Sequence, residues 1–165
     1  MEIREATPDD LEGIRRVAEE SWRTDYPGIL NRENVAAAVD EWYGPERLAG
    51  EIDRDTTLLL VAGDGAVVGF AHALWNRGEG HVLRLYVAPD ARGEGTGRAL
   101  LDRACADLFD RGVDRVTAMV LAANDPGNDF YRTFGFGRVD RGETTIGGEQ
   151  YAENVYALAR DDYRS

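Results

Sequence analysis

One short segment combines glycine and arginine at a strand-to-helix transition in a way that suits phosphate binding. The loop Arg92-Gly93-Glu94-Gly95-Thr96-Gly97, with Arg98 directly after it, lies between an apolar run and a helical pattern. Helix N-termini present backbone N–H groups and a partial positive charge to anions. Glycines let the backbone approach a ligand closely, and the two arginines can add charge-assisted contacts. The segment is therefore a candidate phosphate site, although similar turns also occur as purely structural features.

Two common nucleotide-binding loops are excluded by the same residues. A nucleotide P-loop requires Gly-Lys-Ser/Thr, and all 19 basic residues of this chain are arginine. The dinucleotide fingerprint G-x-G-x-x-G fails as well. Counted from Gly93, its third glycine position holds Arg98, and counted from Gly95 it holds Leu100. The loop therefore matches neither class.

The loop instead resembles the acetyl-CoA signature of the GNAT superfamily of N-acetyltransferases. That signature is Arg/Gln-x-x-Gly-x-Gly/Ala, which Arg92, Gly95 and Gly97 match, and a family-like strand over residues 85–87 stands ahead of it. A second block, residues 124–136, is similar to the family's Asn-x-x-Ala-x-x-Phe/Leu-Tyr-x-x-x-Gly-Phe, with a glycine in place of the alanine. Two blocks in the expected order identify the chain as a member of this family.

The resemblance implies a fold, a reaction and a cofactor. It spans residues 3–158 and implies a single domain over residues 1–165. The implied fold is α/β, with a mixed, mostly antiparallel central sheet of about seven strands and helices on both faces. The implied reaction is direct transfer of an acetyl group from acetyl-CoA to a primary amine in a ternary complex. The residues that it assigns to the cofactor are Leu85, Tyr86, Val87, Arg92, Gly93, Glu94, Gly95, Thr96, Gly97, Arg98, Asn124 and Tyr131.

Three of these residues have specific implied roles. A backbone N–H of the strand, that of Val87 above all, is expected to stabilise the oxyanion on the thioester carbonyl. Tyr131 is expected to protonate the departing thiolate, since a phenol with a pKa near 10 is a plausible acid for an alkyl thiolate. Tyr131 can also be a packing residue. Asn124 is expected to orient the pantetheine arm or a water, or else to cap the helix that follows.

The general base and the acceptor pocket are less defined. Many relatives carry a glutamate at the position of His81, whose pKa suits a base and which alternation places on one face with Leu85. The general base can instead be Glu79, a carboxylate in a loop, or a water molecule. His81 can also be a strand-end residue without a role. Trp22 and Tyr26 resemble the substrate-side residues of the family, and they can equally be hydrophobic anchors.

Hydrophobic periodicity supplies the elements that must position these residues. Strands are expected over residues 3–6, 57–62, 67–75, 81–88, 113–121, 136–146 and 150–158. The first helix is capped by Thr7 and Asp10 and carries an apolar stripe through Val17. Further helices are expected over residues 31–42, 48–52, 96–109 and 126–133. Cys105 falls in an apolar stripe and is expected to be a core residue.

Composition excludes several functional classes. The net charge is -12, from 31 acidic and 19 basic residues, which disfavours nucleic-acid binding. No apolar run approaches the roughly 20 residues that cross a bilayer, and the N-terminus does not resemble a signal peptide. We therefore expect a cytoplasmic protein with no membrane partner. One cysteine and two histidines predict no metal centre. The acidity indicates adaptation to a salt-rich cytoplasm, or alternatively attraction of cationic amines.

The sequence leaves two readings of function. The first is an active N-acetyltransferase with an amine acceptor that the sequence does not identify. The C-terminal strands of relatives often pair in dimers, so a homodimer is an alternative to a monomer. The second is a catalytically silent acyl-CoA-binding regulatory domain on the same scaffold. Both require the loop, whereas the presence of Tyr131 and Asn124 favours the enzyme.

Overall fold

The computed structural model describes residues 2–25, 56–146 and 148–163. The expected helices over residues 31–42 and 48–52 and the expected substrate residue Tyr26 lie outside the described residues.

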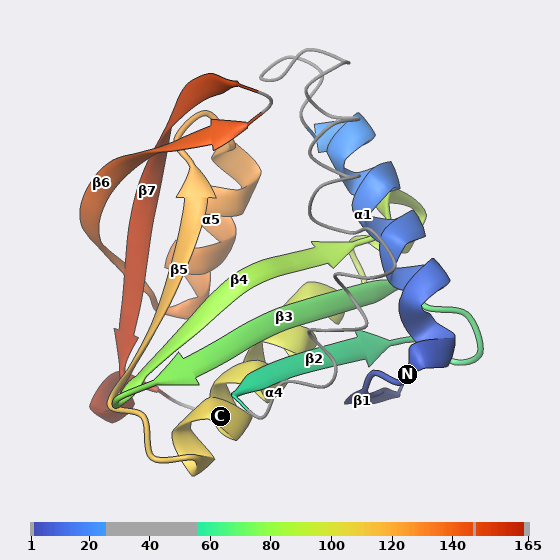
Figure 1. Ribbon diagram of the computed structural model, residues 1–165, viewed down its shortest axis with the longest axis horizontal. Coiled ribbons are helices and arrows are strands. Elements are labelled where there is room, and N and C mark those ends of the chain that lie inside the picture. The colour runs from blue at the N-terminus through green and yellow to red at the C-terminus, as the bar shows by residue number, and fades with distance from the viewer. Residues whose placement is uncertain (1, 26–55, 147, 164–165) are drawn as a thin grey trace.

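Seven strands form one mixed sheet (Figure 1), as the sequence predicts. The strands are β1 (Ile3–Glu5), β2 (Thr57–Ala62), β3 (Gly69–Asn76), β4 (Glu79–Val87), β5 (Arg115–Leu121), β6 (Gly137–Ile146) and β7 (Glu149–Ala159). Their order is β1-β2-β3-β4-β5-β7-β6, so that the last strand of the chain lies between β5 and β6. Neighbours are antiparallel except for β4 and β5, which run parallel.

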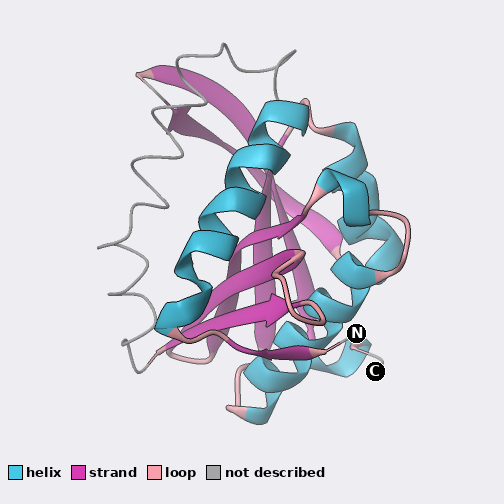
Figure 2. Cartoon of the chain, turned by 90° about the vertical axis from the view of Figure 1, so that its right-hand side faces the viewer, coloured by secondary structure: helices cyan, strands magenta, loops and turns pink. Residues whose placement is uncertain are grey.

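The described helices cover both faces of this sheet (Figure 2). The helix α1 (Leu11–Asp25) lies on one face, whereas α4 (Thr96–Asp110) and α5 (Asp125–Phe134) lie on the other. Three single turns of 3-10 helix are η1 (Pro8–Asp10), η2 (Pro89–Ala91) and η3 (Arg160–Asp162). None of the helices in the described ranges is long and apolar enough to cross a membrane.

Local sequence signals account for where these helices begin. Before α1, the Asp10 carboxylate accepts a hydrogen bond from the Thr7 N–H at 2.9 Å, which confirms the predicted pairing of Thr7 with Asp10. Before α5, the Asn124 side chain accepts from the Gly127 N–H at 3.2 Å. The helix α4 follows Gly95, whose φ of 81° lies in the left-handed region that glycine adopts without strain.

Each face of the sheet buries its own apolar cluster. The cluster under α4 and α5 contains the fully buried Leu100, Leu101 and Leu108, and that under α1 contains Ile14 and Phe70. Cys105 is fully buried in the first cluster, and burial raises the pKa of its thiol to about 12. The thiol is therefore protonated at neutral pH, and the prediction of a core residue is confirmed.

One boundary differs from the prediction in a way that concerns the site. Glu79 lies outside the strand predicted over residues 81–88, but it is the first residue of β4. It pairs with Arg115 of β5 across the parallel ladder, and the two side chains form an ion pair. This cross-strand pair extends β4 by two residues at its N-terminal end.

The parallel strands β4 and β5 stay together for only four residues. Pairing joins Glu79–Val82 to Arg115–Ala118, and both strands then continue apart. A register shift between His72 and Ala73 of β3 faces the point where they separate. Figure 1 shows β4 and β5 diverging as the two arms of a V. This split places two strand edges with unpaired backbone groups opposite each other.

Candidate active site

The split between β4 and β5 opens into a cleft of about 670 Å³. Its walls come from the ends of β4 and β5, the loop before α4, the start of α5, and the hairpin of β6 and β7. Twelve of the sequence-predicted site residues line it, namely Trp22, Leu85, Tyr86, Val87, Arg92, Gly93, Gly95, Thr96, Gly97, Arg98, Asn124 and Tyr131. The fold therefore brings together residues that are more than a hundred positions apart.

The glycine loop forms one end of the cleft. Gly93 and Gly95 have φ values of 85° and 81°, and a Cβ added at either would meet nothing within 4 Å. The space beside the loop is thus open to a ligand. The Nε of Arg92 donates to the Val87 carbonyl at 3.0 Å, which ties the loop to the end of β4. Glu94, also predicted to contact the cofactor, is exposed and does not line the cleft.

The backbone of β4 presents amides to the cleft. The carbonyl of Val87 accepts from Arg92 and from Ser21, whereas the N–H of Ala88 donates toward β3, to Val68 at 2.8 Å. Successive residues of an extended strand point their backbone groups to opposite edges. The N–H groups of Val87 and Leu85 therefore point to the edge that β5 has left. Such donors suit a developing oxyanion.

Tyr131 lies on α5 in an aromatic cluster. Its ring stacks on Tyr156 with centroids 6.1 Å apart and meets Phe130 and Phe136 edge to face. Within the described residues its hydroxyl has no hydrogen-bond partner, and the residue lines the cleft. Burial raises the pKa of Tyr131 above that of an ordinary phenol. The side chain is both a packing residue and a hydroxyl available to a ligand.

A buried polar network around Asn128 was not predicted from the sequence. Its Nδ2 donates to the carbonyls of Leu121 and Asn124, and its Oδ1 accepts from Asn154 Nδ2 and the Tyr156 hydroxyl. The network joins the end of β5, α5 and β7. It therefore holds Asn124 and Tyr131 at the cleft. The only signal in the sequence was an asparagine on the inner side of a short helix.

His81 does not line the cleft. It lies where β4 is still paired with β5, and its Nδ1 is 2.6 Å from the Thr117 hydroxyl on that strand. Its Nε2 lies 3.9 Å from the Glu79 carboxylate. The alternation expected to place His81 on one face with Leu85 is interrupted, because His72 pairs with Arg84 and Ala73 with Val82, which leaves Leu83 as an extra residue of β4. His81 and Leu85 therefore lie on opposite faces of the sheet, and the opening between β4 and β5 begins only after Val82. The structure therefore does not bring His81 together with the other predicted site residues.

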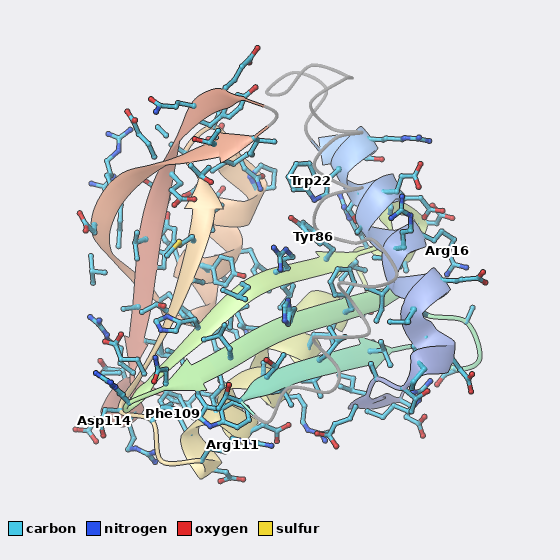
Figure 3. The ribbon with its side chains drawn as sticks, viewed as in Figure 1. Arg16, Trp22, Tyr86, Phe109, Arg111 and Asp114 are labelled. Atoms are coloured by element: carbon cyan, nitrogen blue, oxygen red, sulfur yellow. The ribbon has the colours of Figure 1, made fainter. Side chains whose placement is uncertain are left out.

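The α1 side of the cleft contains a carboxylate that was missed. Trp22 of α1 and Tyr86 of β4 point toward each other (Figure 3), with ring centroids 6.5 Å apart. Trp22 is also 2% exposed and packs in the core, so it is a hydrophobic anchor that lines the cleft. On the same side of the sheet, opposite Leu121, Glu153 of β7 lines the cleft as well. Only the long-range pairing of β7 with β5 reveals its position.

Comparisons with known proteins agree with this geometry. The chain matches the acetyltransferase (GNAT) family over residues 15–136. It is 30% identical over 161 residues to the spermidine N(1)-acetyltransferase of Thermoplasma acidophilum, an alignment that covers 94% of this chain and 98% of that protein. It is 29% identical to the uncharacterized N-acetyltransferase YuaI of Bacillus subtilis, covering 92% and 88% of the two chains.

A solved structure is similar over nearly the same length. The PaiA N-acetyltransferase of Thermoplasma acidophilum, crystallised in complex with coenzyme A, has a TM-score of 0.81 at 30% identity, covering 92% of this chain and 96% of that one. The chain belongs to the acetyltransferase (GNAT) family. It is an acetyl-CoA-dependent N-acetyltransferase that transfers the acetyl group to an amine, and the open, glycine-lined loop at the start of α4 fits the coenzyme's pyrophosphate.

Proposed function

We propose that the amine acceptor is a small polyamine, acetylated on a primary amino group by direct attack in the cleft between β4 and β5. The observation that carries the proposal is the layout of that cleft. The phosphate-binding loop stands at one end, and the α1 side holds a carboxylate among apolar walls formed by Leu83, Met119 and Ile146. Apolar walls suit the methylene chain of a polyamine, and a carboxylate suits its ammonium groups.

Two further observations support this acceptor class. The relative from Thermoplasma acidophilum that aligns over 94% of the chain is a spermidine N(1)-acetyltransferase. The net charge of -12 also favours the approach of a cationic acceptor over an acidic one. A silent acyl-CoA-binding domain would need the loop and room for the pantetheine arm, but it would not need a carboxylate on the α1 side of the cleft.

The residue roles follow from the placement of the cleft-lining groups. The first-turn amides of α4, with Arg92 and Arg98, hold the pyrophosphate. The N–H of Val87 stabilises the oxyanion on the carbonyl that the amine attacks. The Tyr131 hydroxyl donates a hydrogen bond to the thiolate and supplies its proton. We infer these roles from the burial of the Tyr131 side chain and from the direction in which the Val87 N–H points.

The acceptor class is tested with purified protein and acetyl-CoA. Thiol release is followed with spermidine, a diamine, a monoamine of equal chain length, an amino acid and a peptide amine, and products are identified by mass spectrometry. We expect the polyamine and diamine to give the highest kcat/KM. A higher kcat/KM for the amino acid or the peptide would contradict the acceptor class. Binding of acetyl-CoA without turnover of any amine would support the silent domain instead.

We also infer that the acidic surface is an adaptation to high salt. The support is the excess of 31 acidic over 19 basic residues and their spread along the chain. Salt screens the repulsion that such a surface creates.

A further inference from the structure

Glu153 lies beside the point where the cleft reaches the end of β5. It is on β7, directly opposite Leu121, which is the last residue of β5, and opposite Gly142 of β6. Directly paired residues project to the same face with Cβ atoms about 4.5–5.5 Å apart. The Glu153 side chain is therefore next to Leu121, on the α1 side of the sheet. Among the described residues that line the cleft, it is the one acidic side chain.

The Glu153 carboxylate has no hydrogen-bond or ion-pair partner among the residues that the structure describes. It is half-buried, and burial raises its pKa. Burying a carboxylate without a partner costs free energy. A cation that enters the cleft removes this cost, so the position favours an ammonium ligand.

The arginines that line the cleft are engaged elsewhere, so none of them neutralises the Glu153 carboxylate. Arg84 of β4 lines the same cleft, but its guanidinium donates to His72 Nδ1 at 3.0 Å. Arg92 and Arg98 belong to the phosphate end. Other titratable groups lie on the same face of the sheet as Glu153. They are the carboxylate of Asp140, which is opposite Val155 in the strand register, and the phenols of Tyr151 and Tyr86. The Tyr151 hydroxyl donates to Glu149 at 2.8 Å.

We propose that Glu153 is the carboxylate that binds the acceptor's reacting ammonium group and takes its proton. The inference rests on the proposed function, because it requires an amine in the cleft. The N–H bond of the ammonium breaks and its proton moves to a Glu153 carboxylate oxygen. The freed lone pair then forms the C–N bond to the acetyl carbonyl carbon. The C–S bond breaks, and its electron pair leaves with the sulfur, which takes the proton of the Tyr131 hydroxyl. The acylated nitrogen loses its second proton, which restores the phenol, and the proton held by Glu153 passes to solvent.

The test is Glu153→Gln, which keeps the size of the side chain and removes its charge. Isothermal titration of spermidine into protein saturated with coenzyme A should show at least about tenfold weaker binding, while the affinity for coenzyme A is unchanged. The kcat should fall by about 10²–10⁴-fold. In the wild type, kcat/KM should rise with pH through the raised carboxyl pKa, because the base must be ionised. This acidic limb should be absent in the variant.

Glu143→Gln is the matched control, because it removes the same charge from an exposed residue of β6 outside the cleft. It should behave as the wild type in all three measurements. If Glu153→Gln does not fold, Glu153→Asp tests the same point, since it withdraws the carboxylate by one methylene and should lower both kcat and amine affinity. Wild-type values in either folded variant would overturn the inference but leave the function intact. Failure of the wild type to acetylate or bind any amine would overturn the proposed function itself.

Discussion

At the scale of single residues, burial acts on two ionisable groups of the cleft with opposite chemical consequences. Burial raises the pKa of Tyr131 and that of Glu153, because it disfavours the charged form of each. A phenol with a raised pKa stays protonated as the pH increases, but it becomes a weaker acid. A carboxylate with a raised pKa becomes a stronger base. The same physical effect thus keeps a proton on one side of the cleft and favours its uptake on the other.

For Tyr131 we expect Tyr131→Phe to lower kcat by about 10–1000-fold, since the thiolate loses its proton donor. The KM for acetyl-CoA should change little, because the ring and its packing remain.

The raised pKa of Tyr131 further predicts that the enzyme loses no activity through ionisation of this phenol as the pH increases to about 10, the usual pKa of a phenol. Steady-state kinetics over this pH range checks both points. Tyr163→Phe removes a phenol outside the cleft, which donates to Asp102, and serves as the control. An unchanged kcat for Tyr131→Phe would remove Tyr131 from the mechanism.

Asp10 gives a prediction on stability and pH. Its carboxylate accepts hydrogen bonds from Arg4 at 2.8 and 2.9 Å, and the Arg4 bond, followed by that from the Thr7 N–H, lowers its pKa. The stabilisation is therefore complete above the unfolded pKa of about 3.9 and is lost as the pH falls through the lower folded value. At pH 7, Asp10→Asn should lower the free energy of unfolding by about 1–2 kcal/mol. The loss is limited to this range because Arg4 is partly exposed, which weakens its ion pair with Asp10.

Thermal melts of both proteins check this expectation. The difference in Tm should be constant from pH 7 to about 5 and should shrink below about pH 4. The neighbouring Asp9→Asn removes an exposed carboxylate and should leave the Tm unchanged. A difference that stays constant down to pH 2 would contradict the assignment.

At the scale of elements, the site depends on how α4 begins. The left-handed φ values of Gly93 and Gly95 turn the chain so that the loop wraps the N-terminus of α4. An added Cβ would meet no atom of the described residues within 4 Å at either position, so these residues leave room beside the loop. We therefore expect the glycines to be required twice, once for the turn and once for the approach of the ligand.

Gly95→Ala separates these two requirements. The left-handed conformation should cost an alanine about 1–2 kcal/mol of stability, and its methyl group should also weaken coenzyme A binding by tenfold or more. Gly112→Ala is the matched control, because Gly112 has a φ of 91° and nothing within 4 Å of an added Cβ, at the far end of α4. It should show a similar loss in urea denaturation with no change in coenzyme affinity by calorimetry. Equal affinities in the two variants would refute a phosphate-binding role for the loop.

The same scale shows what the sequence can and cannot predict. The helix that begins at Thr96 and the strand Thr57–Ala62 begin where predicted, because apolar period and turn residues are local signals. The place where β4 separates from β5 is set by long-range register, so alternation alone could not show that His81 stops short of the opening. Glu153 was missed for a related reason. Its position depends on β7 lying between β5 and β6 in the sheet. The order of strands in the sheet thus differs from their order in the chain, and a local sequence pattern does not show this.

At the scale of the whole molecule, net charge is the feature that the structure of the cleft does not explain. The chain has 31 acidic and 19 basic residues, and only one of the acidic side chains in its described part lines the cleft. Some of the other described acidic side chains pair with protein groups, as Asp10 does with Arg4 and Glu79 with Arg115, whereas the exposed ones act on solvent, ions and the approach of ligands. Self-repulsion of such a surface opposes folding, and it is weakened when salt shortens the screening length from about 10 Å at 0.1 M to about 3 Å at 1 M.

We therefore expect the Tm at pH 7 to rise as KCl increases from 0.1 M to above 1 M. The control is the same titration near pH 5, close to the sequence pI of about 4.6, where the smaller net charge should reduce the effect of salt. The same KCl series also separates the two explanations of the acidity. Adaptation to salt predicts a higher Tm with little change in KM for spermidine, whereas a surface that attracts cationic amines predicts a KM that rises with KCl. A Tm at pH 7 that does not respond to KCl would rule out salt adaptation, because the repulsion that salt relieves would then be too small to affect folding.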